Sequence, residues 1–297
     1  MFRSFYDKLY HLEAPMFGVF ASEWYSNQCN TDMEYCSNIM KKSVCKLCLN
    51  VKELCRESHI IPKFLYRYIS GENSSLIYMD KIHSKIKYNS EYEGNILCED
   101  CESFIIGKLD TYASKYLYSK SSNNQSTQQT ERKDDRDIVI KKNDPNYDYR
   151  RFKLFWLSVL WRASISSRLF FSRIKLPTAV EEDLRKRILS GNPGTSDEYP
   201  IFINLPPLIN MPDGNKGFIT AHMPTMSPVY VENGEYKMCE FIIQGMHYYY
   251  IIARPSNIKV EPSVTEDTLT VAFRTVEEQN ELIQNIFEMM KGHSKYD

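Results

Sequence analysis

The spacing of apolar residues changes partway along the chain, from a helical period to the shorter period of strands. Between 151 and 171 apolar residues occupy nearly every side of the predicted helix, which is typical of a helix buried in a core. After Gly191 five apolar runs are separated by Pro, Gly and Asn turns. They predict strands over 201–205, 217–223, 239–245, 248–253 and 269–274, which we expect to form one antiparallel sheet. A last helix is predicted over 276–290.

The first half of the chain holds two further helical patterns. The run over 62–69 has helical spacing and puts Lys63 and Arg67 on one face. Another helix is predicted to begin at the second cysteine pair. Its apolar face consists of Phe104, Ile105, Leu109, Ala113, Tyr116 and Leu117.

Composition divides the chain into four segments. An aromatic-rich arm covers 1–44, and a cysteine-bearing module covers 45–118. No apolar residue occurs between 119 and 137, so we predict a polar linker over 119–147. The segment 148–297 then forms a C-terminal α+β domain. Within its first helix Arg162 lies among apolar residues and needs a partner, because an unpaired buried charge is costly.

Four cysteines have the spacing of a structural zinc site. Two Cys-x-x-Cys pairs, Cys45 with Cys48 and Cys98 with Cys101, are separated by 49 residues. Each pair forms a tight turn whose thiolates can face one ion, and four thiolates complete a tetrahedral zinc shell. The chain has eight cysteines in all, and the zinc spacing of half of them favours a reducing cytoplasm over a disulfide framework.

Between the two pairs lies the sequence Ser58-His59-Ile60-Ile61-Pro62, and the last pair is followed directly by Glu102. This order resembles the zinc-bearing bacterial form of the HNH (ββα-metal) endonuclease family over residues 45–118. The resemblance implies that His59 is the general base and that Glu102 binds a catalytic magnesium or manganese ion. The family usually has Asp or His where this chain has Ser58, and His or Asn where it has Glu102. Asp110 lies roughly 12 Å further along the helix axis than Glu102 and is expected to be structural.

Charge and hydropathy limit the setting of this site. The net charge is −1, so a nucleic-acid surface has to be local. Lys63 and Arg67 could hold phosphates beside His59, although a solvated helix face explains them as well. Ten cations against three acidic residues over 150–187 could follow a nucleic-acid backbone, with salt bridges as the other explanation. No run of 18 uncharged apolar residues occurs, so we expect a cytoplasmic protein without membrane contact.

These patterns predict an α+β protein, with a zinc-stabilised ββα-metal (HNH) module followed by a helix and antiparallel-sheet domain. By resemblance, the function is metal-dependent cleavage of nucleic acid, with DNA favoured, in bacterial anti-phage defence. A second copy of the chain or a defence-system protein remains open as a partner. The alternative is a catalytically inactive zinc-stabilised nucleic-acid-binding or scaffolding protein, which Ser58 favours.

Overall fold

The structure is a computed structural model of the chain, and it divides into two compact units, Met1–Met40 and Lys41–Asp297. The described residues are 42–66, 76–79, 84–87, 92–118, 128–133, 136–207, 209–210, 216–217 and 225–291. The first unit, and with it most of the predicted arm 1–44, lies outside them.

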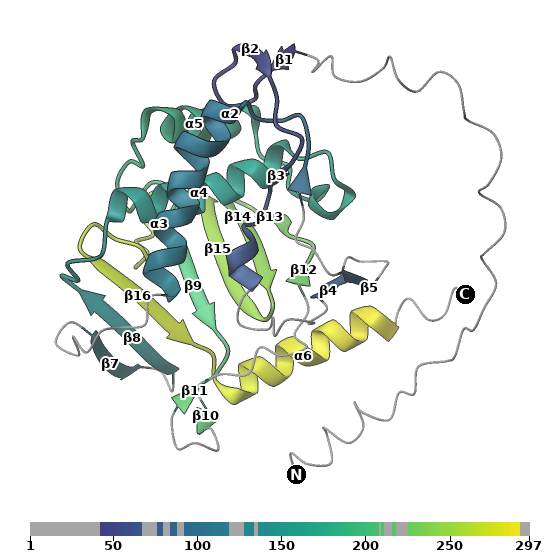
Figure 1. Cartoon of the computed structure of the whole chain (residues 1–297). Helices are drawn as coiled ribbons and strands as arrows, with labels where there is room; N and C mark the ends of the chain where they lie inside the picture. Colours follow the sequence, from purple (N-terminus) through teal and green to yellow (C-terminus); the bar gives the residue numbers. More distant parts are fainter. Residues whose placement is uncertain are drawn as a thin grey trace. The chain divides into compact units, whose positions relative to one another are not determined.

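A seven-stranded sheet is the largest element of the second unit (Figure 1). Its strands lie in the order β13 (Val229–Asn233), β14 (Tyr236–Ile243), β15 (Met246–Ala253), β9 (Ile201–Leu205), β16 (Thr268–Phe273), β8 (Arg136–Lys142) and β7 (Gln128–Lys133). Four of the five strands predicted after Gly191 are confirmed. The fifth lies mostly outside the described residues, where only Lys216–Gly217 is seen as β11, paired with β10 (Ile209–Asn210).

The expectation of a purely antiparallel sheet is wrong at one place. β9 and β16 are parallel neighbours, with Ala272 opposite Asn204, whereas the other pairs of this sheet are antiparallel. The parallel pair is possible because 62 residues, including the hairpin of β14 and β15, separate the two strands.

The predicted linker is also different in the structure, because β7 and β8 extend the sheet there. Ile138 and Val139 of β8 pair with Ala272 and Val271 of β16, which gives β8 apolar neighbours. β7 is the edge strand, and its side chains from 129 to 132 are exposed. An edge strand needs no apolar face, and charged residues there prevent further strands from adding. A composition without apolar residues is therefore compatible with a strand.

Helix α4 (Tyr149–Ile165) is the centre of the core. Asp148 caps it by accepting from the Arg151 N–H, and every residue from Phe152 to Ala163 is buried. Trp156 packs on Tyr248 of β15 with ring centroids 4.4 Å apart, so α4 lies against the sheet. One continuous core includes residues from Cys45 to Leu269, and the predicted module 45–118 and domain 148–297 share it.

Three further helical segments surround α4 or follow the sheet. α5 (Thr178–Ser190) ends at Gly191, which has a φ of 68°. A helical run consists of α2 (Glu99–Cys101), the π-helical turn η2 (Glu102–Ile106) and α3 (Gly107–Tyr118). Its predicted apolar face is buried at Leu109, Ala113 and Tyr116, but Phe104 is exposed. The last helix, α6 (Val276–Lys291), confirms the prediction and lies near the end of β16 in Figure 1.

Helix α4 ends six residues before the predicted end at 171, because Ser166 and Ser167 bond elsewhere. Both hydroxyls and the Ser167 N–H donate to the buried Glu93 carboxylate. This draws the chain out of the helix before the 3₁₀ turn η4 (Leu169–Phe171). Among the described residues, no helix is long and apolar enough to cross a membrane.

Short elements complete the N-terminal part of the unit. β1 (Lys42–Val44) pairs with β2 (Val51–Glu53), and β3 (Ser58–His59) pairs with β6 (Tyr92–Glu93), both antiparallel. Only one 3₁₀ turn, η1 (Lys63–Tyr66), is described where the sequence predicts a helix over 62–69. A small sheet has the order β12 (Thr225–Met226), β4 (Leu76–Met79) and β5 (Ser84–Lys87).

Candidate metal centre and catalytic site

Four thiols from two separate turns converge in this unit. Cys45 and Cys48 lie in the turn of the β1–β2 hairpin. Cys98 is the N-cap of α2, and Cys101 is its last residue. Their sulfurs are all within 4.8 Å of one another, and the Cys48 and Cys98 sulfurs are 3.9 Å apart. Sulfurs about 2.3 Å from a tetrahedral zinc are about 3.8 Å from each other. The four cysteines lie close enough to hold a metal ion, and their geometry is consistent with structural zinc.

Backbone donors favour the thiolate form of one cysteine of this cluster, Cys45. Burial raises the pKa of the Cys45 thiol, but the amides of Cys48, Cys98 and Leu47 outweigh it and bring the pKa to about 7. The Cys98 amide donates to the Cys45 sulfur over 3.3 Å. Amide donors of this kind favour the thiolate, which is the form that binds metal.

The first cysteine turn is also fastened to the C-terminal half of the unit. Lys46 Nζ donates to the Ile165 carbonyl at the end of α4 over 2.7 Å. Arg185 of α5 donates to the Leu47 carbonyl over 2.6 Å, and Leu47 is fully buried. The four-cysteine cluster is therefore part of the common core of the unit.

His59 lies on β3, where its cross-strand partner is Tyr92. Its side chain is half-buried, and burial together with the nearby Arg162 charge lowers the pKa of His59 below its ordinary value. A neutral imidazole is the form that can accept a proton. His59 is therefore available as a base at neutral pH.

Arg162 links the strand of His59 to the helix that follows Glu102. It is fully buried, and its guanidinium donates to the His59 carbonyl over 2.7 Å. The same group forms a bidentate pair with Asp110 of α3, over 3.0 and 3.2 Å. This gives Arg162 the partner that the sequence required, and it agrees with the structural role expected for Asp110.

Glu102 is the first residue of the π-helical turn, directly after Cys101. Burial raises the pKa of its carboxyl, and the adjacent Ser58 hydroxyl and the Arg162 charge partly offset this. Ser58 Oγ and Glu102 Oε2 are both buried and have no hydrogen-bond partner of normal geometry within the described ranges. Buried polar atoms in proteins are rarely left without a partner, and such atoms mark places for a water or an ion.

Comparisons with protein-family models, with curated proteins and with solved structures find no match for this chain.

Of the two cations predicted to hold phosphates, Lys63 lies within the described residues and Arg67 does not. Lys63 lies in η1, is exposed and forms no ion pair among the residues described. Arg67 lies outside the described residues.

Sequence reasoning required a partner for Arg162 but could not identify Asp110 or the His59 carbonyl, because those contacts join positions 52 and 103 residues apart.

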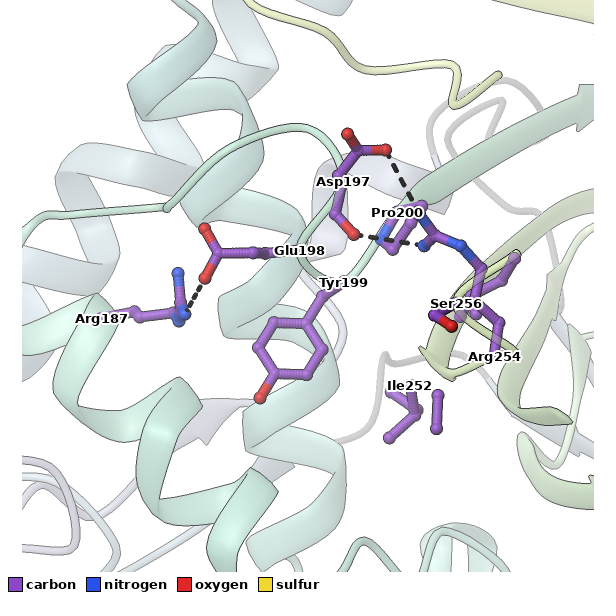
Figure 2. Close-up of a pocket in the computed structure, with 10 residues that line it drawn as sticks. Arg187, Asp197, Glu198, Tyr199, Pro200, Ile252, Arg254 and Ser256 are labelled. Carbon is purple, nitrogen blue, oxygen red and sulfur yellow. Dashed lines mark hydrogen bonds and ion pairs between the residues drawn. The ribbon is translucent and has the colours of Figure 1, made fainter. Parts of the chain in front are cut away.

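An open pocket of about 380 Å³ in the described part of the unit contains none of the predicted site residues. Figure 2 shows that its charged side chains pair with each other. Arg187 pairs with Glu198 over 2.5 Å, and Arg254 pairs with Asp197 over 3.3 Å. Because its charged side chains pair with each other, this pocket offers neither a base such as the His59 imidazole nor a metal ligand such as the Glu102 carboxylate.

Proposed function

We propose that this protein is a metal-dependent endonuclease of the HNH type, hydrolysing phosphodiester bonds in nucleic acid, with DNA favoured. The order of elements supports the proposal: two antiparallel strands, β3 and β6, precede a helix that begins at the second cysteine pair. His59 lies on the first strand, and Glu102 lies at the start of the helical run.

The observation that carries the proposal is that Ser58 Oγ and Glu102 Oε2 are buried beside each other and, among the described residues, have no hydrogen bond of normal geometry, while His59 directly follows Ser58 on β3. Arg162 and Asp110 act electrostatically on both His59 and Glu102, which supports one shared site. A carboxylate oxygen is a hard ligand, and magnesium commonly uses only one or two carboxylates and keeps several waters. Glu102, with the Ser58 hydroxyl beside it, fits such an ion.

The residues of the chain divide the work of hydrolysis. His59 accepts a proton from the attacking water through its imidazole, because its lowered pKa keeps the ring neutral at pH 7. Arg162 fixes the backbone of His59 through its carbonyl. Glu102 would hold the magnesium or manganese ion, which when bound supplies positive charge beside the phosphate.

The direct test is a cleavage assay on DNA and RNA with magnesium or manganese. His59→Ala should reduce the rate about 10²-fold or more, the loss expected for a positioned general base. His247→Asn is the matched control, because His247 pairs with Glu240 on the sheet. Zinc content and circular dichroism should stay at wild-type values in both. Equal activity of wild type and His59→Ala would rule out His59 as the base.

A second function, a catalytically inactive zinc-stabilised nucleic-acid-binding or scaffolding protein, is favoured by one observation. Of the two described residues that the resemblance assigns to the metal, Glu102 contributes a carboxylate and Ser58 offers a neutral hydroxyl. Such a protein would retard nucleic acid on a gel and cut neither DNA nor RNA with any divalent ion. Anti-phage defence, with a second copy or a defence-system protein as partner, belongs to the nuclease proposal and rests on the resemblance.

Glu102→Gln separates the two metal sites. The substitution keeps the size of the side chain and removes its charge, so cleavage should lose its dependence on manganese concentration and fall to background. Zinc content, measured by elemental analysis, should not change, because the four thiols are untouched. A variant that still cleaves with the wild-type manganese dependence would remove Glu102 from the site.

A further inference from the structure

An arginine and a tyrosine lie together beside His59. Tyr92 is the cross-strand partner of His59 in the β3–β6 pair, and 37% of its surface is exposed. Side chains that are directly opposite in an antiparallel pair point to the same face of the two strands. The Arg168 guanidinium lies over the Tyr92 ring, 5.8 Å from its centroid. The pair therefore lies on the same side of the two strands as His59.

Hydrogen bonds around Glu93 hold this pair in place. Glu93 follows Tyr92 on β6, is 7% exposed, and accepts from the Ser166 hydroxyl over 2.5 Å. It also accepts from the Ser167 amide over 3.0 Å and from the Ser167 hydroxyl over 2.7 Å. The Arg168 amide in turn donates to Ser166 Oγ. The segment that carries Arg168 is thus fixed against the strand that carries Tyr92.

The charge of Arg168 is not used within the described part of the protein. Two other arginines lie over tyrosine rings, and each also pairs with a carboxylate: Arg151 with Asp148, and Arg187 with Asp183 and Glu198. Arg168 is exposed and has no acidic partner among the described residues. An arginine stacked on an aromatic ring, with its charge free, presents both a flat surface and a cation.

We propose that Tyr92 and Arg168 bind an unpaired nucleotide of the substrate next to His59. The base stacks on the surface that the two side chains form, and Arg168 contacts the adjoining phosphate. This rests on the proposed nuclease function and names its substrate class, a single strand or an unpaired position. A base inside a duplex is stacked on both sides and is not free to occupy such a surface.

Binding to labelled oligonucleotides tests the proposal, with full-length protein carrying His59→Ala so that nothing is cut. Single-stranded DNA, single-stranded RNA and duplex DNA are compared by fluorescence anisotropy. Tyr92→Ala and Arg168→Ala should each weaken single-strand binding about tenfold, within the range measured for removal of an aromatic stacking partner. Tyr92→Phe should bind like the parent, since the ring is kept. The affinity for the duplex should change little.

Arg151→Ala is the matched control, because Arg151 lies over the Tyr112 ring at the same 5.8 Å distance but at the other end of α4. The proposal is overturned by unchanged single-strand affinity in Tyr92→Ala and Arg168→Ala, by an equal loss in Arg151→Ala, or by a loss confined to the duplex. Whichever of DNA and RNA binds more tightly through Tyr92 identifies the sugar.

The two proposals can fail separately. If single strands bind through Tyr92 and Arg168 but the wild type never cleaves them, the nucleotide-binding site is supported and the nuclease function is rejected. If cleavage depends on His59 but Tyr92→Ala and Arg168→Ala leave the Kd for single strands unchanged, the nuclease function is supported and the nucleotide-binding site is rejected. Zinc content and circular dichroism of each variant ensure that folded proteins are compared.

Discussion

At the scale of single residues, the chemistry of this site depends on what Ser58 can contribute. Ser58 is fully buried beside Glu102, and its hydroxyl has no hydrogen-bond partner of normal geometry within the described ranges. A hydroxyl is a neutral and weak ligand for a hard cation, whereas a carboxylate brings charge. The position therefore decides whether the site is complete or lacks one ligand.

Ser58→Asp tests this directly. Two buried carboxylates repel each other, so the melting temperature without divalent ions should fall below that of the wild type. Manganese should restore it, because an ion that binds only the folded protein stabilises it. Cleavage should saturate at lower manganese concentration than in the wild type. Ser190→Asp, at an exposed position near the end of α5, is the control. If manganese did not raise the melting temperature of Ser58→Asp, the hypothesis that the site lacks one ligand would be wrong.

At the scale of elements, α4 connects the two strands and the helix of the candidate site to the sheet. Its Arg162 is the contact that reaches both the His59 carbonyl and Asp110. A buried ion pair gains little over apolar residues, but loss of one partner leaves the other charge uncompensated. The Arg162–Asp110 pair therefore adds little net stability, but removing one of its two side chains should destabilise the protein.

A double-mutant cycle on Arg162 and Asp110 measures this contact. Arg162→Met should lower the free energy of unfolding by about 3–5 kcal/mol, because Asp110 loses its counter-charge. Asp110→Asn in the same background should cost less than it does alone, which denaturant unfolding can resolve. The control is Arg151→Met on the same helix, whose exposed pair with Asp148 should contribute below about 1 kcal/mol. Additive losses at Arg162 and Asp110 would show that the two side chains are not coupled.

At the scale of the whole described unit, the four-cysteine cluster and the sheet share one core. The cysteine turn is bonded to α4 and α5, and buried residues continue from Cys45 to Leu269. Loss of the metal should therefore weaken the unit as a whole rather than release a separate module.

Removal of the zinc is the corresponding prediction. Cys98→Ser should abolish zinc binding and lower the melting temperature by a large amount, because apparent zinc binding energies of about 10 kcal/mol or more contribute to folding. Cys55→Ser is the control, since Cys55 lies in the same region but outside the cluster. Elemental analysis that finds no metal in well-folded wild-type protein would exclude the zinc site. Two separate thermal transitions on chelation would contradict the shared core.

The sequence by itself determined the features that depend on short stretches of chain. The four-cysteine cluster followed from the spacing of Cys45, Cys48, Cys98 and Cys101, because a Cys-x-x-Cys turn brings two thiols together wherever it lies. β9, β14, β15, β16 and α6 followed from their apolar period, because burial of one face leaves a local pattern.

Only the tertiary structure decided the features that need a distant partner. α4 ends at Ile165 because Glu93 binds Ser166 and Ser167, although the apolar pattern continues to 171. The polar run 128–133 becomes an edge strand because β8 offers it a partner. Tyr92 and Arg168 meet because Glu93, which follows Tyr92, holds the segment that carries Arg168. A sequence pattern records which side of an element is buried, but the atoms that meet there come from positions tens of residues away.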